Sequence, residues 1–129
     1  MKKIEKPIKR MIYTNDRIDE PDILYENTYK GYHYYVISLG THPCCYIALN
    51  KSNRYYNKHY DDIPLYVHGG LTYSDFSNFL SDTKDWIIGW DYAHAGDRYG
   101  NYYRNGHTWK TTELIRDCIK AIDKLEEMI

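Results

Sequence analysis

The sequence predicts an α+β fold, in which a mainly antiparallel sheet of about four strands carries an amphipathic C-terminal helix. Two observations predict this fold. Short runs rich in aromatic and β-branched residues recur between residues 32 and 91, separated by turn residues, and the C-terminal segment has helical periodicity. A chain of 129 residues can bury one hydrophobic core. We therefore expect a charged N-terminal segment at 1–30 and a single α+β domain at 31–129.

The strands are expected in four runs. Residues 32–39 (YHYYVISL) and 45–49 flank a turn, which predicts a hairpin. A third strand is expected at 63–68, where it ends in two glycines, and a mostly apolar fourth strand at 86–91. Between them we expect a loop or short irregular helix at 50–62, a helical turn at 74–80 and a polar loop at 96–106.

The C-terminal helix is the clearest element of the sequence. Thr111 or Thr112 can cap its N-terminus, Glu113 adds acidic charge to the first turn, and the helix extends to about Met128. Its apolar residues recur at three- and four-residue spacing, which predicts one stripe that packs on the sheet. They are Leu114, Ile115, Cys118, Ile119, Ile122, Leu125 and Ile129. Because Cys118 lies within this stripe, we predict that it is a core residue.

Charge and cysteine content argue against several classes of protein. With 17 basic and 18 acidic residues the net charge is −1, whereas direct DNA binding normally requires a basic excess. A local basic patch could still form at 2–10. Three cysteines, two of them adjacent, suit neither a disulfide framework nor a structural zinc site. No apolar run suits a signal peptide or a membrane span, so we expect a cytoplasmic protein that does not enter membranes.

Two blocks carry the candidate site, at 67–73 (VHGGLTY) and 89–97 (GWDYAHAGD). Each places ionisable side chains beside glycines after a strand-like run, where binding sites are commonly built. His68, Asp91, His94 and Asp97 can therefore converge on one point. Imidazole and carboxylate groups are ordinary ligands of Zn²⁺, Mn²⁺ or Fe²⁺, and such a centre can activate water.

Two other interpretations of these residues remain open. Without a metal, His68, His94 and Asp91 can act as acid–base catalysts, because a carboxylate orients an imidazole. Alternatively the histidines bond to backbone carbonyls and the aspartates cap turns, in which case the blocks are structural.

Further residues suit a ligand with an aromatic ring and a phosphate. Arg98 and Arg104 can hold phosphate, and Tyr73, Tyr92 and Trp90 can stack on a base or line its pocket. A solvated loop is the alternative for the segment around the two arginines. The 16 tyrosines suit half-buried binding surfaces, although compositional bias explains them equally well.

The order of these motifs resembles a family of small proteins encoded by phages and prophages. The resemblance covers residues 31–128, and its specific part is the HGGLTY block followed by G(F/W)DxAHxGD. Where the family has glycine, phenylalanine and cysteine this chain has Cys45, Trp90 and Tyr92, and its loop before the last helix is shorter. The resemblance implies an accessory protein that acts against host defences in the bacterial cytoplasm.

Three functions follow as hypotheses. In the first, the protein binds or hydrolyses a nucleotide-like ligand, such as a defence signal, at the His/Asp cluster. In the second, it inhibits a host defence effector, in the manner of an anti-CRISPR protein, through an exposed tyrosine-rich surface. In the third, it is a homo-oligomeric structural domain whose motifs fix two turns.

Overall fold

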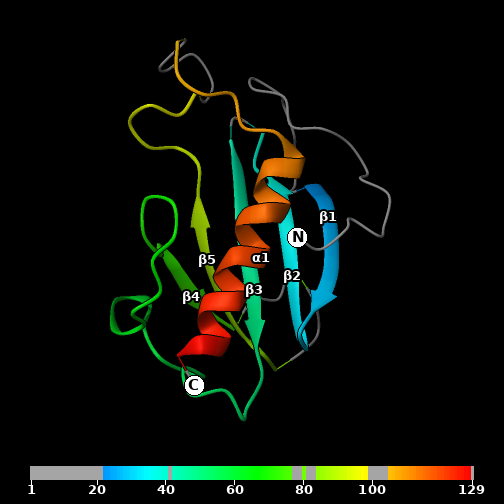
Figure 1. Cartoon of the computed structure of the whole chain (residues 1–129), viewed down its shortest axis with the longest axis vertical. Coiled ribbons are helices and arrows are strands. Elements are labelled where there is room, and N and C mark those ends of the chain that lie inside the picture. The colour runs from blue at the N-terminus through cyan, green and yellow to red at the C-terminus, as the bar shows by residue number, and fades with distance from the viewer. Residues whose placement is uncertain (1–21, 41, 77–79, 81–83, 99–104, 129) are drawn as a thin grey trace.

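The computed structural model describes residues 22–40, 42–76, 80, 84–98 and 105–128, which form one antiparallel sheet with a helix across one face (Figure 1). The strand order is β1-β2-β3-β5-β4, and every neighbouring pair is antiparallel. This confirms the α+β fold class, with five strands where about four were expected. The elements are β1 (Asp22–Tyr29), β2 (Tyr32–Ser38), β3 (Pro43–Leu49), the 3₁₀-helix η1 (Tyr60–Asp62), β4 (Tyr73–Asp75), β5 (Trp86–Asp91) and α1 (Thr111–Glu127).

Two of the five strands, β1 and β4, were not expected, and β1 lies at one edge of the sheet and within the first 30 residues. It forms a hairpin with β2 through Lys30 and Gly31, whose φ angles are +49° and +83°. Positive φ at both central residues is typical of the type I′ turn, which matches the twist of a two-residue hairpin. The polar residues Glu26 and Asn27 interrupt the apolar pattern, so the sequence did not predict this strand. An edge strand tolerates polar residues because one of its two sides pairs with no neighbouring strand.

The segment 63–68 is not a strand, which corrects the expectation above. Ile63, Leu65 and Val67 are buried and the residues between them are more exposed, as in a half-buried strand. However, Pro64 lacks an N–H, and the Leu65 N–H donates to the Ile63 carbonyl rather than to a neighbouring strand. The segment is therefore extended and packed, but unpaired. The helical turn expected at 74–80 is also wrong at its start, where Tyr73–Asp75 forms β4 and pairs with β5.

Helix α1 packs its apolar stripe on one face of the sheet, as the periodicity predicts. Its N-cap is Lys110, not Thr111 or Thr112; the Lys110 backbone N–H donates to the Glu113 carboxylate over 2.9 Å. Thr111 is fully buried as the first helical residue. Cys118 is fully buried, so the prediction that it is a core residue is confirmed.

The alternation of β5 separates two sides of the molecule. Ile88 and Trp90 belong to the core under α1, whereas Ile87 belongs to the smaller cluster on the opposite face. Asp91, the last residue of β5, follows Ile87 in this alternation. As a result, the side chains of Trp90 and Asp91, at the end of β5, lie on different faces of the sheet.

Candidate functional site

The two sequence blocks meet where the 67–70 turn faces the loop after β5. The Gly70 N–H donates to the Val67 carbonyl and closes the first turn, and the Asp97 N–H donates to the His94 carbonyl and closes the second. Gly69 has φ +68°, and a Cβ built there would overlap the His94 imidazole. Glycine is therefore required at 69 both for its backbone angle and for the close approach of His94.

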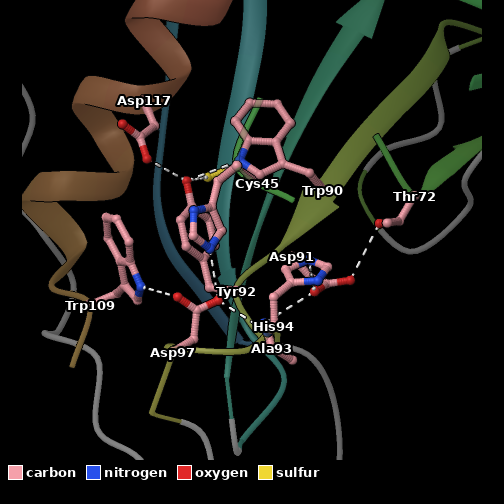
Figure 2. Close-up of polar contacts among 11 residues, drawn as sticks. Cys45, Thr72, Trp90, Asp91, Tyr92, Ala93, His94, Asp97, Trp109 and Asp117 are labelled. Atoms are coloured by element: carbon pink, nitrogen blue, oxygen red, sulfur yellow. Dashed lines mark hydrogen bonds and ion pairs between the residues drawn. The ribbon is translucent and has the colours of Figure 1, made fainter. Parts of the chain in front are cut away.

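His68 and Asp97 form the first of two histidine–carboxylate pairs. His68 Nε2 lies 2.7 Å from Asp97 Oδ2, and Asp97 is 2% exposed. Asp97 accepts two further hydrogen bonds, from Trp109 Nε1 over 2.7 Å and from the His94 backbone N–H over 3.1 Å (Figure 2). Burial of Asp97 raises its pKa, but the hydrogen bonds from His68, Trp109 and His94 outweigh burial, so the pKa lies below its usual value. Asp97 is thus a carboxylate held in its charged form.

Aromatic rings fix the His68 imidazole. It stacks on Tyr92, with ring centroids 4.7 Å apart and an interplanar angle of 8°, and contacts Trp109 edge-on at 5.0 Å. The Tyr92 hydroxyl accepts from Trp90 Nε1 and donates to Asp117 Oδ2 over 2.7 Å. Burial raises the pKa of Tyr92, so its hydroxyl stays protonated and keeps this hydrogen bond. The arrangement therefore leaves His68 little freedom to rotate.

His94 and Asp91 form the second pair, which is less well directed. His94 Nε2 is 3.0 Å from Asp91 Oδ1, but this buried nitrogen has no partner in hydrogen-bond geometry. Asp91 also accepts from the Ala93 N–H and, at 3.3 Å, from the Thr72 hydroxyl (Figure 2). The Ala93 contact is the turn-capping role that the structural interpretation predicts.

The four side chains expected to converge therefore split into two pairs. The His68 and His94 rings contact each other at a centroid distance of 5.7 Å, but His68 is hydrogen-bonded to Asp97, whereas His94 Nε2 only lies close to Asp91. Across the described residues, no group of three or more His, Cys, Asp or Glu side chains is placed to hold a metal ion. The geometry thus supports acid–base pairs and gives no support to a Zn²⁺, Mn²⁺ or Fe²⁺ centre built from these four residues.

A pocket of about 270 Å³ opens beside His68, on the face covered by α1. Its walls are aromatic and its rim is charged. The residues that line it are Tyr66, Val67, His68, Trp90, Trp109, Asp117, Lys120, Ala121 and Lys124. Of these, His68 and Trp90 were expected from the sequence. Asp117, Lys120 and Lys124 were missed; their spacing on α1 places all three on one helix face, which was the available signal.

The other predicted ligand residues lie elsewhere. Tyr92 lies behind the pocket, stacked on His68. Tyr73 lines a second pocket of about 230 Å³, with Cys44 and Asp91, on the sheet face away from α1. Arg98 does not line either pocket, and its Nε is buried without a hydrogen-bond partner. Arg104 lies outside the described residues.

Among the residues that the structure describes, the tyrosines are mostly buried or half-buried. Within the part of the chain that the structure describes, Tyr66 is the one largely exposed tyrosine, at 83%. The buried tyrosines are Tyr25, Tyr32, Tyr34, Tyr35, Tyr46, Tyr55 and Tyr92. Within the described ranges, tyrosine therefore serves mainly as a core residue.

Comparisons with known proteins do not assign the chain to a group. It matches no protein-family model, no curated protein and no solved structure. No helix among the described residues is long and apolar enough to cross a membrane. The site geometry is therefore the main basis for a functional proposal.

Proposed function

We propose that the protein binds a nucleotide-like ligand in the pocket beside His68 and that the His68–Asp97 pair acts on it as an acid–base group. One observation carries this proposal: the His68 ring is both a wall of the pocket and the partner of a nearly buried carboxylate. Binding pockets combine apolar and aromatic walls with a few placed polar groups, and this pocket has that composition.

The pocket offers complementary groups for each part of a nucleotide. Trp109 and Tyr66 provide aromatic surface for a base, and Lys120 and Lys124 provide positive charge for a phosphate, whereas Trp90 is almost fully buried beneath the pocket. A volume of about 270 Å³ is near the lower end for small-molecule pockets, which span roughly 300–1,000 Å³. This size favours a mononucleotide unit over a larger ligand.

The His68–Asp97 pair supports hydrolysis as well as binding. The Asp97 carboxylate is an acceptor, so it favours the tautomer with a proton on Nε2 and leaves Nδ1 with a free lone pair. In hydrolysis of a phosphoester, Nδ1 would take a proton from the attacking water, and the imidazolium would return it to the leaving oxygen. Asp97 would stabilise the charged imidazolium between these two steps.

The biological setting of the proposal comes from the resemblance to phage and prophage proteins. On that basis the ligand is a nucleotide signal of a bacterial defence system, encountered in the host cytoplasm. The pocket supports this proposal because its lining combines aromatic side chains, which suit a base, with two lysines, which suit an anion.

The test is calorimetric titration of the protein with nucleoside monophosphates. We expect His68→Ala to weaken binding at least about tenfold, the equivalent of roughly 1.4 kcal/mol, in a variant that is less stable without the hydrogen bond to Asp97 but still folded. His33→Ala is the matched control, because His33 also pairs with a carboxylate, Glu26 at 3.0 Å, but does not line the pocket. Equal affinity of both variants and the wild type would contradict the proposal.

A further inference from the structure

Asp117 is the one acidic side chain among the described residues that line the pocket. It is half-buried on α1, and its Oδ2 accepts a hydrogen bond from Tyr92. The structure records no ion pair between Asp117 and the lysines that follow it on the same helix face, at 120 and 124. Because a carboxylate has about four acceptor positions, this single hydrogen bond leaves Asp117 able to accept further donors from a ligand.

The part of the ligand next to Asp117 must therefore present hydrogen-bond donors. A half-buried carboxylate loses hydration when a ligand enters, and this loss is offset only if the ligand donates to it. A cationic ligand would also supply donors, but Lys120 and Lys124 line the same pocket and would repel it. The pocket consequently favours a neutral donor edge joined to an anionic group.

Guanine meets this requirement better than the other nucleobases. Its N1–H and its 2-amino group are adjacent donors that match the two oxygens of a carboxylate. Adenine and cytosine place a ring acceptor beside their amino group, and uracil places a carbonyl on either side of its N–H, so each directs lone pairs at the carboxylate. A carboxylate next to the base would thus discriminate by repulsion as well as by attraction.

We infer that Asp117 selects a guanine base and that the ligand of the His68 pocket is a guanine mononucleotide, with its phosphate held by Lys120 and Lys124. This inference rests on the proposed function, because it names the ligand class of the same pocket. The two lysines are one helical turn apart and follow Asp117 on one face of α1, which places the base-reading and phosphate-binding groups side by side.

The experiment compares the affinities of GMP, IMP, AMP and XMP for the wild-type protein by calorimetry. We expect GMP to bind roughly 10- to 100-fold more tightly than AMP, since hydrogen bonds to charged groups are the stronger kind. IMP lacks the 2-amino donor and should fall between them. This ligand series requires no variant, so it tests the inference even if substitutions at 117 impair folding.

The second part of the experiment measures the same four affinities for the variant Asp117→Asn. Its amide oxygen can keep the Tyr92 hydrogen bond, while its N–H group now suits the 2-carbonyl of xanthine, so preference should move from GMP to XMP. Asp123→Asn is the matched control, because Asp123 lies on the same helix and accepts from Tyr29 over 2.9 Å, away from the pocket. We expect this control to keep the preference for GMP.

The outcomes separate the inference from the proposed function. If GMP, IMP and AMP bind with equal affinity, selection by Asp117 is wrong and nucleotide binding stands. If Asp117→Asn keeps the wild-type preference for GMP, the inference is likewise overturned. If none of the four nucleotides binds, both the inference and the proposed function fail.

Discussion

Asp97 accepts three hydrogen bonds from three parts of the chain, and its charge therefore contributes to stability as well as to the proposed chemistry. The donors are His68 after the extended segment, His94 in the loop after β5 and Trp109 just before α1. Asparagine in its place keeps only one acceptor oxygen, so at least one of these donors loses its acceptor. A buried charged partner of this kind typically contributes a few kcal/mol.

Asp97→Asn should lower the free energy of unfolding at pH 7 by about 2–3 kcal/mol. The pKa of Asp97 is lowered in the folded state, so its stabilising effect is complete above the pKa of the unfolded chain and is lost as pH falls through the folded value. Urea denaturation at pH 7 and near pH 3 measures this. The difference between wild type and variant should shrink at the lower pH. A constant difference would show that the Asp97 charge does not stabilise the fold.

Gly69 and Gly70 form a matched pair for testing the contact between the two sequence blocks. Both have positive φ angles, +68° and +82°, so alanine carries a similar backbone cost of about 1–2 kcal/mol at either position. Only at 69 would the new Cβ overlap His94, since nothing lies near that of 70. We expect Gly69→Ala to be the more destabilising by thermal denaturation. Equal losses would contradict the close approach of His94.

The residue scale also shows what the sequence could predict about the site. The two blocks predicted that His68, Asp91, His94 and Asp97 lie near one another, and they do. The sequence could not predict their pairing, because pairing depends on how the 67–70 turn and the turn at 94–97 face each other in the folded chain. No group of three or more possible ligands is placed to hold a metal ion among the described residues, so the metal site stays a prediction.

At the scale of elements, α1 has two tasks. Its apolar stripe covers the sheet, and its polar flank supplies Asp117, Lys120 and Lys124 to the pocket. Substitutions in the apolar stripe should therefore change stability, and substitutions on the polar flank should change ligand binding.

Ile122→Ala should cost about 2–5 kcal/mol of unfolding free energy, because Ile122 is fully buried and alanine leaves a cavity. Lys120→Ala, two residues away, should change stability by less than about 0.5 kcal/mol but weaken binding of a nucleotide. Chemical denaturation and calorimetry on the two variants measure both effects. A loss of stability in Lys120→Ala comparable to that in Ile122→Ala would contradict this orientation of the helix.

The sequence predicted the elements whose apolar residues recur with a clear period, but it did not predict the edge strands of the sheet. Strands β2, β3 and β5 and helix α1 are largely where the sequence places them. β1 was missed because its polar residues are tolerated only at an edge, and 63–68 was overpredicted because it alternates like a strand without pairing. Asp117 and the two lysines were overlooked because charged residues on a helix surface are usually solvated.

At the scale of the whole molecule, the sheet separates two pockets. One lies under α1 with His68, and the other lies on the opposite face with Asp91 and Tyr73. We propose that the ligand binds in the first. A ligand should therefore affect His68 directly and leave histidines on the far face of the sheet unchanged.

The most direct test is the nuclear magnetic resonance signals of the histidine rings during titration with GMP. The account predicts that the His68 signals shift with saturable dependence on concentration, while those of His33, on β2 beside Tyr35, do not move. A titration in which the His68 signals stay unchanged at millimolar GMP would contradict nucleotide binding beside the His68–Asp97 pair.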